Sequence, residues 1–299
     1  MNVPPVIRTQ GIAFSVGAWL LILAHTLFLK GDSPAEILVL ALVILFLGVP
    51  HGALDTLYVR QFFRMHSYWA WAAFAVAYVG LAAMVVSVWI ATPLIFLVSF
   101  LGVSAFHFSG DPVVHTPPIF RVIYGGAVIV FPALLHAQGV TALFSMLAGA
   151  EAAAISADAL HWLAYPWLLA TLLVAARHAK KNVVTSLELL SVSALAIVVS
   201  PLLAFSMYFC GMHGLRHILR TRELVEHKSF RHLFQVALPP FLLTLTGAAA
   251  GWYFLKDASL DTRVMQLVFV SLAALTVPHM MLVDRSRFFG GLEKFRMAS

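Results

Sequence analysis

Long apolar runs dominate this 299-residue chain and restrict the folds open to it. Ten runs are long enough, or nearly so, to cross about 30 Å of hydrocarbon as helices. They lie near residues 11–29, 35–59, 68–91, 93–110, 119–138, 159–176, 186–200, 202–219, 236–255 and 263–283. Hydrophobic residues make up 61% of the sequence, charged residues only 11%, and the mean hydropathy is +0.92, which excludes a water-soluble globule with an ordinary charged surface. We therefore predict an all-α polytopic membrane protein, a single helical domain over residues 1–299 with about ten transmembrane helices.

Pro201 separates the seventh run from the eighth, so one kinked helix from Ser186 to Leu219 is an alternative to two spans. The basic residues favour two spans, because ten spans place four groups of basic residues on one side of the membrane. These segments contain Arg60, Arg64, Arg177, Lys180, Lys181, Arg220, Arg222, Lys228, Arg231, Arg285, Arg287, Lys294 and Arg296. Glu151 and Asp158 fall on the other side, and the net charge of +6 forms no basic stripe for nucleic acid. We therefore predict a multi-pass protein of the plasma or inner membrane with both termini in the cytoplasm.

Five of the thirteen histidines lie deep inside even-numbered spans, at similar distances from the start of each span. They are His51 in VPHGALD, His107 in SAFHFSGD, His213 and His217 in MHGLRH, and His279 in TVPHMMLVD. Each follows the start of its span by roughly 12–17 residues, or about 18–25 Å of helix. Because even-numbered spans run in the same direction, the five imidazoles are expected at one depth in the cytoplasmic half of the membrane. Ionisable groups are costly inside a membrane, so this layer indicates a functional site.

Imidazoles that four helices bring to one depth are typical of a metal held in the core of a bundle. His213 and His217 are four residues apart, so both project from one helix face and can reach one ion. Imidazole suits zinc, copper, iron and nickel, and the single cysteine, Cys210, offers no thiolate set for a closed zinc site. Open coordination positions inside an apolar cavity favour Fe(2+) and dioxygen chemistry on a membrane substrate.

Two carboxylates follow histidines of this layer at a spacing of four residues. Asp55 follows His51, and Asp111 follows His107. On a helix this spacing lets each carboxylate accept the second ring N–H of the preceding histidine and fix its tautomer. The alternative is that both aspartates only mark helix ends that approach the cytoplasm.

His279 stands alone on its span and has no carboxylate four residues later. We expect it to lie beside the ligands and to orient a neighbouring group rather than to bind the metal. Pro50, Gly52, Gly211 and Gly214 flank the histidines of the second and eighth spans and are expected to permit bends or close helix contacts. The other histidines are expected in ordinary surroundings: His25, His136 and His161 bonded to a carbonyl or a headgroup, and His66, His115, His178, His227 and His232 in or beside loops.

The motifs GVPHGALD, AFHFSGD, MHGLRH and VPHMMLV, in that order, make the chain resemble the Brp/Blh family of bacterial and archaeal membrane proteins. Characterised members of that family are β-carotene 15,15′-dioxygenases. The resemblance implies cleavage of the central double bond of β-carotene by O2 at a non-haem iron, giving two molecules of all-trans retinal, with a retinal-binding rhodopsin as a partner. It also implies that His51, His107, His213 and His217 are the catalytic residues and the iron ligands.

Other functions compete for the same histidine layer. A metal or proton transporter would use the His/Asp layer as a relay, but it needs polar residues on both sides of the layer, and the outer halves of the spans contain almost none. A haem-binding electron carrier, a di-iron enzyme with further histidine boxes and an opsin-assembly partner with a vestigial site are also possible. Absorbance of the purified protein for haem and elemental analysis for iron separate most of these alternatives.

Overall fold

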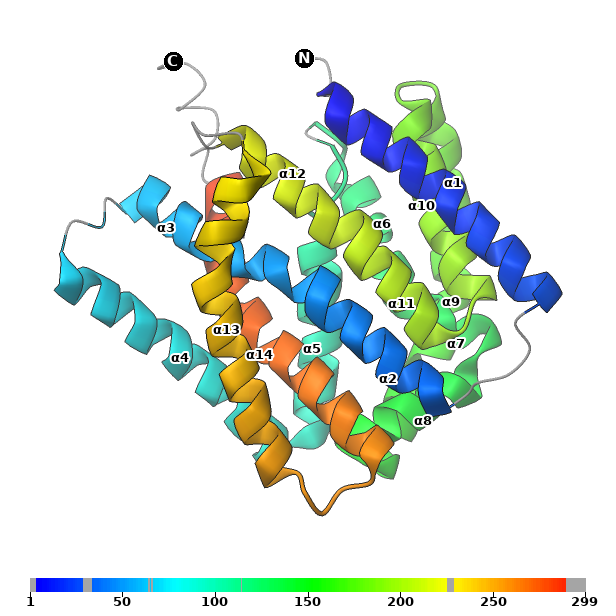
Figure 1. The fold of residues 1–299 in the computed structure, drawn as a ribbon. Coiled ribbons are helices and arrows are strands. Elements are labelled where there is room, and N and C mark those ends of the chain that lie inside the picture. Colours follow the sequence, from blue (N-terminus) through cyan, green and yellow to red (C-terminus); the bar gives the residue numbers. More distant parts are fainter. Residues whose placement is uncertain are drawn as a thin grey trace.

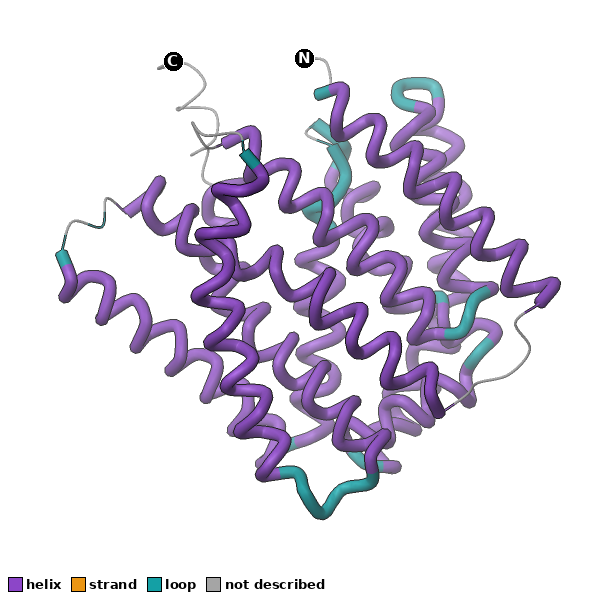
Figure 2. Tube along the Cα trace, in the orientation of Figure 1, coloured by secondary structure: helices purple, strands orange, loops and turns teal. Residues whose placement is uncertain are grey.

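The computed structural model describes residues 4–28, 34–63, 65, 67–113, 115–224 and 229–288, and these residues form helices joined by loops, with no strand (Figure 2). The elements in chain order are α1 (Pro5–Phe28), α2 (Pro34–Val43), η1 (Ile44–Gly48), η2 (Val49–Leu54), α3 (Asp55–Phe63), α4 (Tyr68–Ala91), α5 (Pro93–Phe108), α6 (Pro118–Val130), α7 (Pro132–Leu135), α8 (Ala137–Ala148), α9 (Ala150–Ala179), α10 (Val183–Val198), α11 (Pro201–Met207), η3 (Tyr208–Gly214), α12 (Leu215–Leu224), α13 (Phe230–Phe254) and α14 (Leu260–Phe288). Arg64, His66, His227, Lys228, Lys294 and Arg296 lie outside the described residues.

Helices cover all ten predicted apolar ranges almost completely. Among the described residues, six helices are long and apolar enough to cross a membrane: Pro5–Phe28, Glu36–Arg60, Tyr68–Ala91, Ala150–Ala179, Phe230–Phe254 and Leu260–Val283. Shorter apolar helices are α5, α6, α8 and α10, and α8 lies almost wholly between the fifth and sixth predicted ranges. The fold is therefore an all-α membrane bundle, whereas ten crossings stay a prediction.

The chain breaks at Pro201, as the prediction of two separate spans requires. α10 ends before Val199, and the backbone of Val199 and Ser200 is extended, with ψ values of 150° and 141°. Pro201 then begins α11, a position that suits proline because the first N–H groups of a helix have no partner within it. The continuous helix formed by α11, η3 and α12 runs back in the opposite direction to α10 (Figure 1). The alternative of one kinked helix was wrong.

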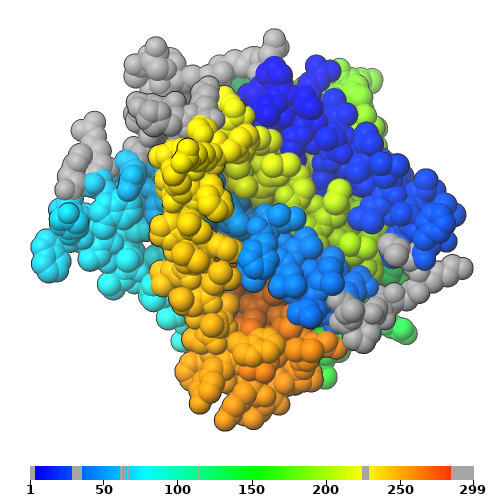
Figure 3. Space-filling model, in the orientation of Figure 1, coloured from blue at the N-terminus to red at the C-terminus, as the bar shows by residue number. Residues whose placement is uncertain are grey.

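The outward faces of the bundle are apolar. α4 contains no buried residue along its whole described length, although its hydropathy is 2.2. Trp69 and Val76 of α4 are 86% and 73% exposed. On another face, α13 forms a ridge beside α2 (Figure 3), and Leu243 on it is 67% exposed. Such surfaces suit hydrocarbon rather than water, so we treat the chain as an integral membrane protein.

The histidine-bearing segments pack against one another and contribute to a large apolar core. That core centres on α6, α9, α10 and α11, and it includes the fully buried Tyr124, Leu189 and Val192 together with Phe131, which lies between α6 and α7. α14 packs against η2 and α5, and η1 packs against η3. The four helical segments that carry the histidines are therefore direct neighbours in the fold.

Candidate metal centre

Five histidine rings meet inside the bundle. They are His51 in η2, His107 in α5, His213 in η3, His217 in α12 and His279 in α14, and all five are buried. In six of the pairs that they form, the ring centroids lie 4.7–5.6 Å apart. The prediction that four helices bring these imidazoles to one place is confirmed.

Two of these segments leave α-helical geometry at the cluster. η1 is π-helical and leads into η2, a 3-10 helix that begins at Val49–Pro50 and carries His51. η3, which carries His213, is also π-helical. Single π turns inside α-helices occur frequently at functional sites, because they displace side chains from the regular helix face.

Close backbone approach occurs at two glycines near the cluster. A Cβ atom at Gly48 would collide with the ring of Phe209, and one at Gly214 would lie 3.0 Å from the Phe209 carbonyl oxygen and 3.4 Å from His51 Nδ1. The expected close contact therefore fits Gly214. It does not fit Gly52, which faces open space, or Gly211, where a Cβ atom would make only ordinary contacts.

Asp111 orients His213. The Nδ1 atom of His213 lies 3.0 Å and 3.1 Å from the two carboxylate oxygens of Asp111, and the Tyr208 hydroxyl donates to the same carboxylate at 2.6 Å. Burial alone would raise the pKa of Asp111, but His213 and Tyr208 hold it well below its usual range. With Nδ1–H donated to Asp111, His213 keeps its lone pair on Nε2, which lies 3.1 Å from His107 Nε2.

Asp55 orients His279 in a similar way. His279 Nδ1 lies 2.6 Å from one Asp55 oxygen, and the Tyr78 hydroxyl donates to the other at 3.0 Å. His279 Nε2 is buried and has no hydrogen-bond partner among the described residues. It belongs to a ring that contacts the rings of His51, His107 and His217.

The predicted partners of the two aspartates were therefore wrong. Asp55 contacts His279 rather than His51, whose Nδ1 bonds to the Gly48 carbonyl, and Asp111 contacts His213 rather than His107. The stretch after His51 is a 3-10 helix with about three residues per turn, so a residue four positions on points away from the same face. α5 ends at Phe108, so Asp111 lies beyond the helix that carries His107.

The donor set fits a transition metal. One ring nitrogen from each of His51, His107 and His279 lies within 4.8 Å of the others. Two nitrogens bound at about 2.1 Å to one ion lie roughly 3.0–3.4 Å apart, and His107 Nε2 and His213 Nε2 are 3.1 Å apart. Facing lone pairs in a buried site repel one another unless a proton or a cation lies between them. A set made only of imidazoles suits iron, zinc or copper.

The structure contains a buried ion pair beside the cluster that the sequence analysis did not predict. The guanidinium of Arg216 is fully buried and bonds to both carboxylate oxygens of Glu188 at 2.8 Å and 2.9 Å. Arg216 also donates to Gln10 at 2.8 Å and to the Asp111 carbonyl at 3.1 Å, and Arg220 donates to that carbonyl at 2.6 Å. The sequence could have indicated this pair, because Glu188 and Arg216 carry opposite charges inside two neighbouring predicted spans.

Two of the histidines that we expected in ordinary surroundings, His136 and His161, bond to backbone carbonyl groups. His136 Nε2 bonds to the Val198 carbonyl at 3.2 Å, and His161 Nδ1 bonds to the Ala133 carbonyl at 2.9 Å. Both match the prediction of a histidine satisfied by a carbonyl group.

Comparison with known proteins identifies the family. A family model described as beta-carotene 15,15′-dioxygenase matches residues 42–285, a range that contains all five clustered histidines and both aspartates. A protein of uncultured marine bacterium 66A03 named beta-carotene 15,15′-dioxygenase is 31% identical over 255 residues, covering 82% of this chain and 91% of the relative. No solved structure matches the chain significantly. The chain belongs to the β-carotene 15,15′-dioxygenase family of membrane enzymes, as its resemblance to Brp/Blh proteins implies.

Proposed function

We propose that this chain cleaves the central double bond of β-carotene with O2, giving two molecules of all-trans retinal, at an Fe(2+) held by the histidine cluster. The observation that best supports this proposal is that five buried imidazoles from four helices lie together. The name of the family model and of the relative from the marine bacterium supports the substrate and the reaction. Iron, when bound, supplies the activation of dioxygen.

His51, His107, His213 and His217 are the proposed catalytic iron ligands. Their burial keeps water from the reacting centre, which protects reactive species from side reactions. Asp111 supports this role for His213, because it accepts the Nδ1–H and leaves Nε2 free to bind a cation. Phe209 stacks on His213 with ring centroids 5.7 Å apart and adds an apolar wall at the same place.

His279 is proposed as a further iron ligand, beyond the orienting role predicted from the sequence. Asp55 bonds to its Nδ1, so its buried Nε2 faces the cluster as Nε2 of His213 does. The variant His279→Ala separates the two roles. A ligand role predicts that bound iron falls in step with activity, whereas an orienting role predicts wild-type iron content with reduced turnover.

The membrane setting and the partners follow from the same proposal. β-Carotene is itself apolar, so it reaches the site from the lipid bilayer, and the product suits a retinal-binding rhodopsin. The basic segments support a plasma or inner membrane location with both termini in the cytoplasm.

Co-expression with β-carotene synthesis tests the proposal. Cells that accumulate β-carotene should lose it and accumulate retinal when they express the wild-type chain, and His51→Ala, His107→Ala, His213→Ala and His217→Ala should each abolish the conversion. His136→Ala is the matched control, because His136 bonds to a carbonyl away from the cluster. Unchanged carotene with a folded, iron-loaded protein would overturn the proposal. Metal or proton flux through such a protein would favour a transporter.

A further inference from the structure

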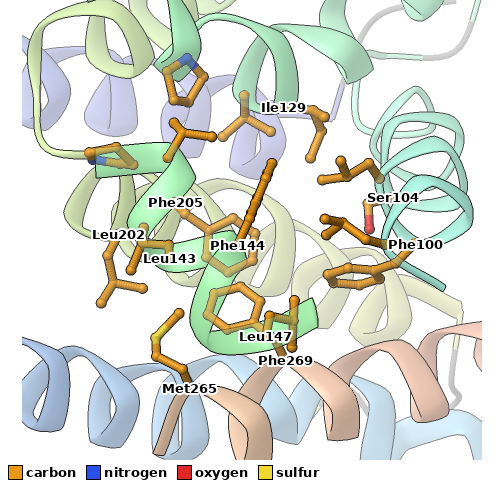
Figure 4. A pocket seen from close by; sticks show the side chains of 16 residues that line it. Phe100, Ser104, Ile129, Leu143, Phe144, Leu147, Leu202, Phe205, Met265 and Phe269 are labelled. Atoms are coloured by element: carbon orange, nitrogen blue, oxygen red, sulfur yellow. The ribbon is translucent and has the colours of Figure 1, made fainter. Parts of the chain in front are cut away.

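A cavity of about 80 Å³, lined by 16 of the described residues, lies between helices that include α5, α11 and α14 (Figure 4). Ser104 supplies the only polar side chain among these lining residues, and the others are aliphatic, aromatic, methionine or proline. The lining of the cavity therefore suits an apolar group.

Three walls of the cavity belong to the helices that also supply histidines. Phe100 in α5, Phe205 in α11 and Phe269 in α14 line it, and the Phe205 and Phe269 rings lie 5.3 Å apart. Along each continuous helix these positions lie 7–10 residues before a clustered histidine, or roughly 10–15 Å. Along each of these three helices the cavity therefore lies two to three turns from a clustered histidine.

A row of stacked aromatic rings lies between the cavity and the cluster. Ser104 is buried and lies one turn before His107 on α5. On the neighbouring helix, Phe205 stacks on Phe209 at 5.3 Å, and Phe209 stacks on His213 at 5.7 Å. A flat conjugated chain can follow this row of stacked rings from the cavity to the histidines.

We propose that this cavity binds one ring-bearing end of the carotenoid, so that the central double bond lies at the histidine cluster. The inference rests on the proposed function, because it assumes a substrate that is cleaved at its middle. Such a substrate needs an apolar site at a fixed distance from the reacting atoms, and the two-to-three-turn separation along α5, α11 and α14 supplies it. The depth of the cavity would then select both the carotenoid and the bond that is cleaved.

Filling the cavity tests the proposal. Leu101→Trp adds a bulky ring to the α5 wall, and Val98→Trp is its control, because Val98 is on the same helix but 54% exposed on the outer surface. Each protein is loaded with β-carotene without oxygen, and the retained carotenoid is measured by absorbance together with bound iron. Leu101→Trp should retain roughly tenfold less carotenoid with unchanged iron, and Val98→Trp should match the wild type.

A second variant keeps the test valid if Leu101→Trp does not fold. Leu143→Phe narrows the cavity from α8, a helix that supplies no clustered histidine among the described residues, and Ala142→Phe on the exposed face of α8 is its control. Wild-type carotenoid binding by a folded, filled variant would overturn the proposal. The same outcome with loss of a copurified phospholipid would assign the cavity to a lipid chain. A wild-type protein that binds no carotenoid at all would instead contradict the proposed function.

Discussion

The two aspartate–histidine pairs at the cluster share a geometry but differ in how they are held. The Asp111 carboxylate bonds to His213 and Tyr208, while its backbone carbonyl accepts bonds from Arg216 and Arg220. The Asp55 carboxylate bonds to His279 and to Tyr78, which lies on α4, the helix with no buried residue along its described length. One pair is therefore fixed by the buried core, and the other by one hydroxyl from the periphery.

Because of this difference, we expect the Asp111 side of the centre to be rigid and the Asp55 side to be able to move. Charged donors such as Arg216 form hydrogen bonds that are roughly twice as strong as neutral ones. The Asp111 side should therefore set where the metal binds, whereas the Asp55 side can shift with α4. The following variants test that distinction, from the largest expected effect to the smallest.

Replacing Arg216 with Met should have the largest effect, because it leaves the buried Glu188 carboxylate without its partner. Breaking a buried ion pair from one side destabilises a protein by about 3–5 kcal/mol. Thermal unfolding of the purified protein should show this loss. The double variant Arg216→Met with Glu188→Leu removes both charges and should recover much of the stability. A double variant as unstable as the single one would show that the pair is not the source of the effect.

Asp111→Asn should lower iron affinity by about 100-fold, the upper end of the range for such orienting groups. The amide keeps the size of the side chain but weakens the acceptor for His213 Nδ1. Equilibrium titration with Fe(2+) measures the change. Asp158→Asn on α9 is the control, since Asp158 is exposed. Wild-type affinity would support the alternative that Asp111 only marks a helix end.

Asp55→Asn should act in the same direction but less strongly, at about 10-fold in iron affinity or rate. His279 would lose its charged acceptor, yet the other four histidines keep their partners. Steady-state conversion of β-carotene and iron content measured on one preparation give both quantities. An effect larger than that of Asp111→Asn would reverse the comparison between the two pairs.

Tyr78→Phe should be the mildest change. It removes the hydroxyl that donates to the Asp55 carboxylate but leaves the carboxylate and its bond to His279, so the rate should fall by less than the roughly 10-fold expected for Asp55→Asn. The matched variant Tyr208→Phe removes the equivalent bond to Asp111 and should cost more, because Tyr208 is fully buried. Equal effects of the two variants on the rate would mean that α4 holds its aspartate as firmly as the core does.

Sequence reasoning located the histidines but mispaired the carboxylates, and the physical reason is local. The shared depth of the histidines depends on the direction and length of the spans, so small irregularities of the helices do not change it. The partner of Asp55 depends on the 3-10 turn after His51, and the partner of Asp111 depends on a turn beyond the end of α5. Such irregular turns change which face a residue occupies and leave only weak marks, such as Pro50, in the sequence.

The ion pair between Glu188 and Arg216 was predictable in principle. Both charges lie inside ranges that the sequence marks as apolar spans, where an unpaired charge is costly. The cavity was not predictable, because its walls come from residues that are distant in the chain and indistinguishable from ordinary apolar packing. Only the arrangement in space shows that Phe100, Phe205 and Phe269 line one cavity.

Metal removal and replacement test the central claim most directly. The purified protein is stripped of metal, reloaded with Fe(2+) or with Zn(2+), and assayed for retinal production from β-carotene in the presence of O2. We expect one iron per chain in the wild type, no activity in the stripped or zinc-loaded protein, and recovery with Fe(2+) that His213→Ala prevents and His136→Ala does not. Full activity without iron, or iron binding unchanged in His213→Ala, would contradict the account.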